Sequence, residues 1–217
     1  MLLPLLIAAV IGYLLGALPF GWLIARKFGI NIFEHGSKNP GATNVKRVLG
    51  EKFGAKGKRA GDLAFFLDAL KGAAAVGVAK VVAAKWTSNG SGDVSVEALA
   101  ITGLVFALIG HSFSCWTRFK GGKGVATSAG GLFVLLPMPT LLALVAWVTV
   151  FQVSRYVSLA SIVASIALPA AAWLLDAPTA FAVLASILGV FVIARHKSNI
   201  GRLLNGTENK FAKKPAA

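Results

Sequence analysis

The sequence predicts an all-α membrane protein of about seven transmembrane helices, with the N-terminus outside and the C-terminus in the cytoplasm. Three observations predict this class: 56% of the 217 residues are apolar, the mean hydropathy is +0.74, and only 14% of the residues are charged. A soluble core cannot enclose so much apolar sequence beneath so few charges, so the composition is typical of membrane proteins. We expect a single integral membrane domain over residues 1-217.

Each helix is expected where an apolar run approaches the roughly 20 residues that cross a hydrocarbon core about 30 Å thick. The expected spans are Leu2–Ala25, Asp62 to about Lys85, about Val94–Phe113, Val125–Met138, Thr140–Val153, Val157–Leu175 and Ala177–Ala194. The fourth and fifth spans are short, and we expect two helices there because Pro137 and Pro139 disfavour one continuous helix. The first run carries no positive residue before Arg26, unlike a cleavable signal peptide, so we expect a permanent span.

The distribution of positive charge predicts the orientation. With the N-terminus outside, the segments Arg26–Gly61, Cys115–Gly124, Arg155–Tyr156 and Arg195–Ala217 all fall on one side, while Trp86–Asp93 forms a turn-rich connection opposite. Counting Lys71, that side holds 20 of the 22 Lys and Arg residues. Cytoplasmic loops of membrane proteins are rich in Lys and Arg, so these segments are expected inside. An even number of spans would break the pattern.

The segment Gly36–Arg47 is the first candidate site. It combines two glycines, a proline, two hydroxyl residues, two asparagines and three cations. Glycine and proline disfavour a regular helix or strand, which predicts a loop dense in hydrogen-bond donors, with Arg47 able to bind a phosphate in a bidentate manner. Either the loop binds an oxyanion, or it is a solvated basic loop.

A second candidate is His111-Ser112-Phe113 together with the glycine-rich run from Phe119 to Thr127. Glycines that lead into an apolar helix expose successive backbone N–H groups, and a helix N-terminus favours an anion. Lys123 adds a positive charge there. The Walker A spacing is absent, and the competing interpretation of this run is a tight turn.

Two further features carry polar groups. If the last span continues, His196 and Asn199 share a helix face at spacing i, i+3, although a basic tail also suits anionic lipid headgroups. Asp68 and Lys71 lie inside the second span at the same spacing. Ionisable residues within a span indicate either a substrate role or a self-neutralising pair that holds helices together.

Composition also limits the function. A single cysteine, Cys115, excludes an intrachain disulfide and a cysteine-built metal site. The three histidines and few acids show no ligand spacing, so we expect neither a metal nor a cofactor. The net charge of +14 is expected to serve orientation and contact with membrane lipids, and no basic groove interleaved with aromatic residues indicates nucleic acid.

Four stretches together resemble one family, the bacterial membrane acyltransferases that transfer a fatty acyl group from acyl-phosphate to glycerol 3-phosphate. The stretches are Gly16–Gly21 (Gly-Ala-Leu-Pro-Phe-Gly), Gly36–Arg47, His111-x-Phe113 with Gly121–Thr127, and Asn199-x-x-Arg202-Leu203-x-x-Gly206-Thr207-Glu208. The resemblance implies seven helices, an outside N-terminus, and an active site that faces the cytoplasm from the bacterial inner membrane. It implies lysophosphatidic acid and phosphate as products.

The residues matching the family motifs imply a set of site residues. As catalytic residues we expect His196, Asn199, Glu208, Lys123 and Arg47. As substrate-binding residues we expect Gly36, Ser37, Asn39, Gly41, Thr43, Asn44, His111, Gly121, Gly122, Gly124, Thr127, Ser158 and Arg202. Ser37, Thr43, Asn44, Arg47 and Lys123 are expected to hold the phosphates, and His196, Asn199 and Glu208 to orient glycerol 3-phosphate.

The expected chemistry needs no covalent enzyme intermediate, because acyl-phosphate is a mixed anhydride with a good leaving group. The sequence contains no Gly-x-Ser-x-Gly elbow and no His followed by Asp five positions on. The main tasks are therefore positioning and charge stabilisation. The proton of the attacking hydroxyl goes either to His196 or to a substrate phosphate oxygen.

Three positions depart from the family pattern, which usually has Ser at Ala17, Arg at Phe33 and Gly at Lys38. A transporter of an organic phosphate is the alternative function, but such a protein is expected to show a repeat and charges near mid-membrane on several spans. Neither is evident here. A structural basic membrane protein would leave the two glycine-rich segments unexplained.

Overall fold

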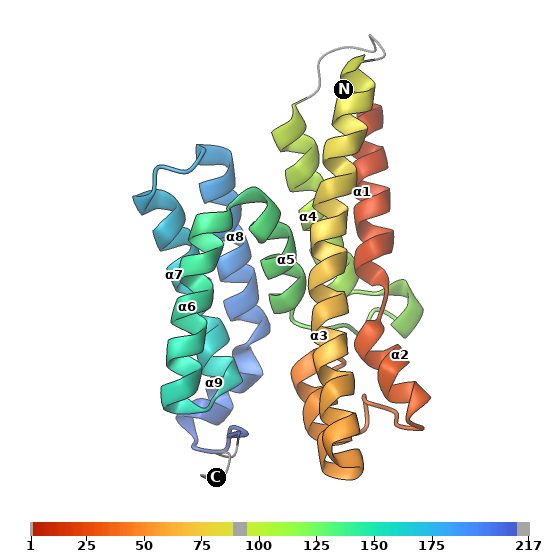
Figure 1. Cartoon of the computed structure of the whole chain (residues 1–217), viewed down its shortest axis with the longest axis vertical. Helices are drawn as coiled ribbons and strands as arrows, with labels where there is room; N and C mark the ends of the chain where they lie inside the picture. Colours follow the sequence, from red (N-terminus) through yellow and green to blue (C-terminus); the bar gives the residue numbers. More distant parts are fainter. Residues whose placement is uncertain (1, 89–94, 212–217) are drawn as a thin grey trace. The chain divides into compact units, whose positions relative to one another are not determined.

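The computed structural model describes residues 2–88 and 95–211. Part of the expected connection at Trp86–Asp93 and the first residue of the span expected from Val94 lie outside the described residues, as does the end of the tail. Within the described ranges every regular element is a helix. The chain forms two compact units, Met1–Leu135 and Leu136–Ala217 (Figure 1).

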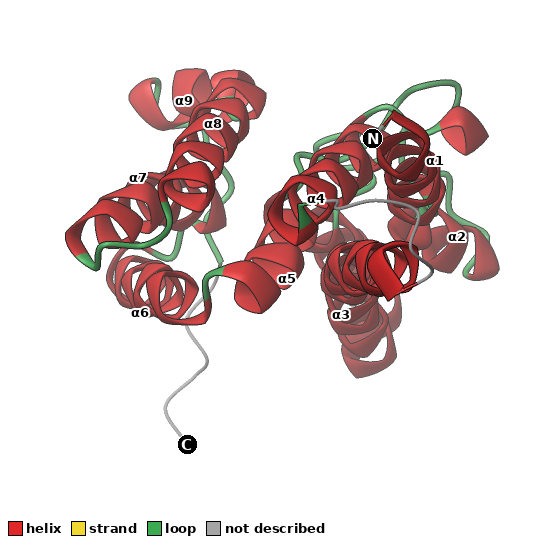
Figure 2. Ribbon diagram, turned by 90° about the horizontal axis from the view of Figure 1, so that it is seen from above, coloured by secondary structure: helices red, strands yellow, loops and turns green. Residues whose placement is uncertain are grey.

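The described residues of the first unit form five α-helices and one 3₁₀ turn. These are α1 (Leu2–Ala17), α2 (Phe20–Lys27), α3 (Ala42–Ser88), α4 (Val96–Ser112), the 3₁₀ turn Cys115–Thr117 and α5 (Val125–Leu135). Helices α1, α3 and α4 lie side by side in both views, and α5 packs against α3 and α4 (Figures 1 and 2). Helix α2 packs against α3.

Helices α1 and α4 pack closely because small residues line their contact. A Cβ on Gly16 of α1 would overlap the backbone of Ala107 in α4. A Cβ on Gly12 would in the same way meet the backbone of Gly103. Small residues that allow backbones to approach are the usual means of packing helices in a membrane, where lipid and Leu side chains are equally apolar.

The first span is broken, which differs from the continuous run expected over Leu2–Ala25. Helix α1 ends at Ala17 and α2 begins at Phe20. Pro19 lies at the break and has no backbone N–H to continue the helical hydrogen bonds. Gly21 then allows the backbone at Pro40 to approach, since a Cβ on Gly21 would overlap the Pro40 carbonyl. The break therefore brings α2 against the segment that precedes α3.

The expected loop over Arg26–Gly61 is also partly wrong, because α3 already begins at Ala42. Thr43–Arg47 are helical, Arg26 and Lys27 belong to α2, and of the expected loop only residues 28–41 lie outside the α-helices. Helix α3 folds back at Gly54, whose φ of 58° and ψ of −133° interrupt the helical backbone. The helical arms before and after Gly54 pack closely at Gly61, because a Cβ on Gly61 would overlap Lys46 of the first arm. The segment therefore forms a helical hairpin that turns at Gly54, although its charged residues suggested an irregular loop.

Up to residue 211, where its described part ends, the second unit forms four helices: α6 (Pro137–Ser154), α7 (Val157–Leu174), α8 (Thr179–Arg195) and α9 (Lys197–Leu204). Helix α7 packs against α6 and α8, and α9 contacts α7 and α8. The expectation of two helices around Pro137 and Pro139 is confirmed: α5 ends at Leu135 and α6 starts with Pro137. A proline in the first turn is tolerated because the N–H groups there have no helical partner.

Within residues 2–88 and 95–211, four helical segments have the length and apolar composition to cross a membrane. They are Leu2–Lys27, Val96–Thr117, Pro137–Ser154 and Val157–Leu174. A fifth is added if α8 and α9, which bend by 58° at His196, form one span. Among the described residues, α5 is a shorter apolar helix, and α3 carries the charged pair Asp68 and Lys71 within its apolar part.

Candidate active site

The loop before α3 is organised by the side chain of Asn44, which is 3% exposed. Its Oδ1 accepts a hydrogen bond from the Ser37 N–H at 2.9 Å. Its Nδ2 donates to the carbonyls of His35 and Asn39, each at 3.0 Å. Three loop backbone groups are therefore held by one amide in the first turn of α3. Asn44 therefore shapes the loop that the sequence predicts as a phosphate-binding segment.

Two residues of this loop have left-handed backbone conformations. Gly36 has a φ of 58°, and a Cβ there would overlap Asn44 Oδ1, so both the conformation and the space require glycine. Lys38 has a φ of 53°, a region that glycine adopts at little cost and lysine does not. The lysine at this position, where the family pattern has glycine, is therefore a source of backbone strain.

Two other expected phosphate-binding residues lie on the same face of α3. Thr43 and Arg47 are four residues apart in its first two turns, and both are half-buried. Gly41 N–H donates to Asn39 Oδ1 at 2.8 Å, which turns the chain into the helix. Arg47 therefore projects from a helix whose start is fixed by the asparagines of the loop.

The glycine-rich run from Gly121 to Gly124 lies against His111 at the end of α4. Gly122 N–H donates to the His111 carbonyl at 3.1 Å, and a Cβ on Gly122 would overlap the His111 ring. Gly124, with a φ of 83°, leads into α5, where Ser128 N–H donates to its carbonyl at 2.8 Å. Lys123 is half-buried between them. The run therefore delivers a glycine-rich backbone to a helix N-terminus, as the sequence predicted.

Two buried hydroxyls lie in the first turn of α5. Thr127 and Ser128 are 0% and 6% exposed, and neither hydroxyl has a hydrogen-bond partner among the residues that the structure describes. Buried polar atoms are nearly always paired, so such atoms are expected at sites with a function.

The structure joins the two glycine-containing segments of the first unit. Asn39 Nδ2 donates to the Gly121 carbonyl at 3.5 Å, although these residues are 82 positions apart. The sequence predicted both segments as sites on one side of the membrane but not this contact.

In the second unit, Glu208 accepts hydrogen bonds from three side chains that are expected site residues. Its Oε1 accepts hydrogen bonds from Ser158 Oγ at 2.9 Å and from Asn199 Nδ2 at 2.7 Å. Its Oε2 accepts from Arg202 Nε, also at 2.7 Å. The Glu208 side chain is only 6% exposed. Residues from α7, α9 and the tail therefore meet at one carboxylate.

The end of α9 explains how Glu208 reaches this position. Gly206 has a φ of 67°, its N–H donates to the Leu203 carbonyl, and the Thr207 N–H donates to the Arg202 carbonyl. This pair of bonds is the Schellman arrangement that ends helices at glycine. The chain then returns to the turn between α6 and α7, where the Phe211 N–H donates to the Arg155 carbonyl at 3.0 Å.

The surroundings of Glu208 lower its pKa. Burial alone raises the pKa of this carboxyl, but the hydrogen bonds from Asn199, Ser158 and Arg202 and the charge of Arg202 outweigh that effect. The pKa of Glu208 is therefore below its ordinary value, and the group is a carboxylate at neutral pH.

His196 lies at the bend between α8 and α9 and is 3% exposed. Its Nδ1 is 2.7 Å from the Val192 carbonyl oxygen, which can only accept a hydrogen bond. The neutral ring therefore carries its proton on Nδ1 and a lone pair on Nε2. That tautomer is the one a general base requires at Nε2.

The sequence predicts two of the three members of a buried ionic cluster formed by Asp68, Lys71 and His111. The Asp68–Lys71 pair, which the sequence offered as one of two interpretations, is present: Lys71 Nζ lies 2.8 Å from Asp68 Oδ1. No sequence pattern indicates that His111 joins this pair, because His111 lies on a different helix, α4. Within residues 2–88 and 95–211, no group of three or more His, Cys, Asp or Glu side chains could hold a metal ion.

The fold and these clusters define a helical protein that combines membrane-spanning segments with buried polar groups suited to anionic substrates. The sequence model of the glycerol-3-phosphate acyltransferase family matches residues 6–206, and the chain belongs to this family. A glycerol-3-phosphate acyltransferase of Fusobacterium nucleatum is 42% identical over 203 residues, covering 93% of this chain and 95% of the relative. One from Aquifex aeolicus is 38% identical over 206 residues, covering 95% and 98%.

Solved structures agree with this assignment. The chain is similar to crystal structures of PlsY, described as an integral membrane glycerol 3-phosphate acyltransferase. Its glycerol 3-phosphate form is 36% identical with a TM-score of 0.82, covering 96% of each chain. Its lysophosphatidic acid form, also 36% identical, has a TM-score of 0.79 and covers 96% of this chain and 95% of the other. The chain is therefore an integral membrane protein of the acyltransferase class.

Proposed function

We propose that this protein transfers a fatty acyl group from acyl-phosphate to the sn-1 hydroxyl of glycerol 3-phosphate. The products are lysophosphatidic acid and inorganic phosphate. The observation that carries the substrate assignment is the likeness, over 96% of the chain, to a structure in its glycerol 3-phosphate form. The acyl-phosphate donor rests on the motifs of the sequence.

The transfer is a direct displacement. The sn-1 oxygen attacks the acyl carbon, a C–O ester bond forms, and the bond between the acyl carbon and the phosphate oxygen breaks. Phosphate leaves with the electron pair, and the hydroxyl proton goes to His196 Nε2 or to a phosphate oxygen. The protein supplies orientation and stabilises the negative charge that develops on the acyl oxygen.

In the first unit, we assign phosphate binding to Arg47, Lys123 and the backbone of Gly121–Gly124. The half-buried positions of both cations and the helix N-terminus at Val125 support this role. We assign the same role to the hydroxyls of Thr43, which lies one turn before Arg47 on α3, and of Ser37 in the preceding loop. Asn39, Asn44, Gly36 and Gly41 hold the loop in shape, as their hydrogen bonds and close contacts indicate.

In the second unit, we assign the orientation of glycerol 3-phosphate to His196 and Asn199. Glu208 accepts from Asn199, Ser158 and Arg202, and so holds the Asn199 amide in a single orientation. Both His196 and Asn199 are buried, which suits groups that act in a site with little water.

We further propose the topology that the charges predict. Seven spans, an outside N-terminus and a cytoplasmic site in the inner membrane would use α1 with α2, the second arm of α3, and α4 to α8. The support is that 20 of the 22 Lys and Arg residues fall on one side in this arrangement. We also propose that residues 1–217 act as one domain, since the family match extends across both units.

The function can be tested with purified protein in detergent, glycerol 3-phosphate and acyl-phosphate. Equal amounts of released phosphate and lysophosphatidic acid are expected, and the same assay with acyl-CoA should give no product. Uptake of glycerol 3-phosphate into vesicles without product would instead establish a transporter. Arg47→Ala is the matched test of the phosphate assignment: full activity and unchanged substrate affinity would refute it.

A further inference from the structure

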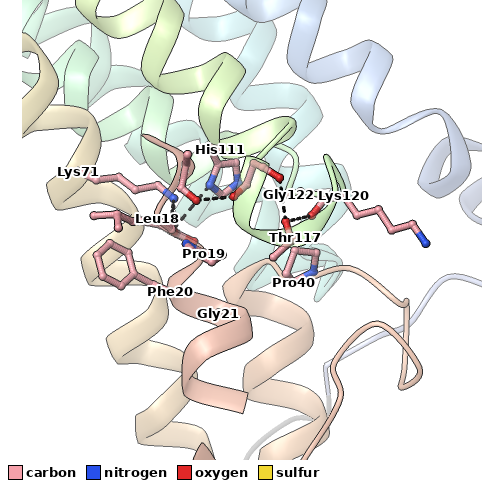
Figure 3. Close-up of a pocket in the computed structure, with 14 residues that line it drawn as sticks. Leu18, Pro19, Phe20, Gly21, Pro40, Lys71, His111, Thr117, Lys120 and Gly122 are labelled. Atoms are coloured by element: carbon pink, nitrogen blue, oxygen red, sulfur yellow. Dashed lines mark hydrogen bonds and ion pairs between the residues drawn. The ribbon is translucent and has the colours of Figure 1, made fainter. Parts of the chain in front are cut away.

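Asp68, Lys71 and His111 form a buried ionic cluster inside the first unit, and Figure 3 labels two of its members, Lys71 and His111. Lys71 Nζ lies 2.8 Å from Asp68 Oδ1, and His111 Nδ1 lies 3.6 Å from the same oxygen. The three side chains are 3%, 4% and 9% exposed in the order Lys71, Asp68, His111. Burying ionisable groups in a membrane span is costly, so their retention requires a reason.

Lys71 binds the break in the first span. Its Nζ donates to the Leu18 carbonyl at 2.8 Å and lies 5.6 Å from the centre of the Phe20 ring. Leu18 lies between α1 and α2, and its carbonyl also accepts a hydrogen bond from the Phe20 N–H at 3.1 Å. Ser114 Oγ donates to the neighbouring Ala17 carbonyl. The break is thus stabilised by donors from α3 and from the segment after α4.

His111 fixes the glycine-rich run on the opposite side of the cluster. Its carbonyl accepts from the Gly122 N–H, and its ring occupies the space that a Cβ at Gly122 would need. Gly121 approaches equally closely, since a Cβ there would overlap the His111 carbonyl. The position of the His111 ring therefore determines where the run begins.

The space between these groups is too small for a substrate. The pocket that Asp68, Lys71 and His111 share with the break and the glycine-rich run has a volume of about 10 Å³. A volume on the order of 10–15 Å³ is room for one water molecule. The space beside the cluster therefore has room for about one water molecule in this structure.

We infer that Asp68, Lys71 and His111 are positioning residues that hold the glycine-rich run at a fixed distance from the break in the first span. The Asp68 carboxylate is the common partner: it orients Lys71 toward Leu18 and His111 toward Gly122. The inference rests on the proposed acyl transfer, for which the run supplies phosphate-binding N–H groups. It also reassigns His111, which the sequence had suggested as a substrate contact.

The test compares Asp68→Asn with Asp62→Asn. Asp62 is on the same helix and also pairs with a lysine, Lys46, but its side chain is 60% exposed, so it is a matched control. For each variant, kcat and KM for acyl-phosphate are measured together with hydrogen exchange of peptides covering residues 113–124. Exchange in this segment reports on bonds such as Gly122 N–H to the His111 carbonyl and Phe119 N–H to the Ser114 carbonyl.

For Asp68→Asn we expect faster exchange in residues 113–124, unchanged exchange in α7, and kcat/KM reduced by about 10²-fold, the loss typical of a misplaced group. Asp62→Asn should match the wild type in all three. Unchanged exchange in 113–124 with normal kcat/KM in folded Asp68→Asn would overturn the inference. Failure of the wild type to form lysophosphatidic acid would instead refute the proposed function, whatever the exchange data show.

A double variant distinguishes a positioning role of Asp68 and Lys71 from an ion pair that only stabilises the fold. It also provides a test if Asp68→Asn alone does not fold. Asp68→Asn/Lys71→Met removes both charges, which usually restores the stability that loss of one partner costs. We expect its melting temperature to approach that of the wild type while kcat/KM stays low, because the variant restores neither the carboxylate beside His111 nor the Lys71 hydrogen bond to Leu18. Recovery of both quantities would show that the pair only stabilises the fold and would contradict the positioning role.

Discussion

The side-chain oxygen of Asn44 lies against the α-carbon of Gly36, in the space that a Cβ would occupy. The same oxygen accepts the Ser37 N–H, so the absence of a side chain at Gly36 and the hydrogen bond of Asn44 depend on each other. The loop before α3 can close only with glycine at this position.

Gly36→Ala should therefore damage both stability and substrate binding. The φ of 58° alone costs a non-glycine residue about 1–2 kcal/mol, and the new Cβ displaces Asn44. We expect a lower melting temperature and a higher KM for glycerol 3-phosphate. The control is Gly77→Ala in α3, where a Cβ has no neighbour within 4 Å and should raise helix stability by up to about 1 kcal/mol. Equal behaviour of the two variants would contradict the prediction.

Lys38→Gly should stabilise the protein by about 1 kcal/mol, because it relieves the strain of a lysine at a φ of 53°. Thermal unfolding in detergent measures the change. Lys52→Gly, at an exposed helical position in α3, should have the opposite sign by about 1 kcal/mol. If Lys38 also attracts a phosphate, the KM of Lys38→Gly rises while its melting temperature increases. A fall in stability would show that Lys38 makes contacts that exceed its strain.

Glu208 should make the free energy of unfolding decrease at low pH. Because its folded-state pKa is lowered, the stabilisation is fully present above the ordinary glutamate pKa of about 4.3 and is lost as the pH falls through the folded-state value. Glu208→Gln should reduce the drop in melting temperature between neutral pH and about pH 3. Glu51→Gln, at an exposed position on α3, should leave that drop unchanged. An identical acid response in Glu208→Gln and the wild type would exclude this role.

His196→Ala tests where the hydroxyl proton goes. With His196 as the base, kcat should fall by about 10²–10⁴-fold, the usual contribution of a positioned base. His35→Ala keeps the backbone carbonyl that Asn44 binds and should retain most of the activity. Near-normal turnover of His196→Ala would assign the proton to a substrate phosphate oxygen.

The sequence predicts contacts within one helix better than contacts between residues that are far apart in the chain. Apolar runs located the helices, and the spacing of Asp68 and Lys71 indicated an ion pair because both residues are on one helix turn. The contact of His111 with Asp68 joins different helices, so no local periodicity encodes it. The carboxylate of Glu208 similarly meets Ser158 across 50 residues, through a chain reversal that depends on Gly206.

Helical content near the candidate site was underestimated for a related reason. The charges and glycines of residues 42–61 suggested an irregular loop, but only Gly54 interrupts the helix. The other glycines, such as Gly57 and Gly61, lie where the two arms of α3 touch. Composition does not distinguish a glycine that breaks a helix from one that allows two helices to meet.

Because of the turn at Gly54, the direction of Arg47 and the charge at the tip of the α3 hairpin can change independently of each other. The arm from Ala42 to Phe53 is held against the other arm through backbone contacts at Gly57 and Gly61, so the direction of Arg47 does not depend on the residues at the tip. The tip itself carries exposed charges such as Lys52 and Lys56. Changes there can alter the long-range attraction of an anionic substrate, and hence its association rate, without altering the geometry that binds it.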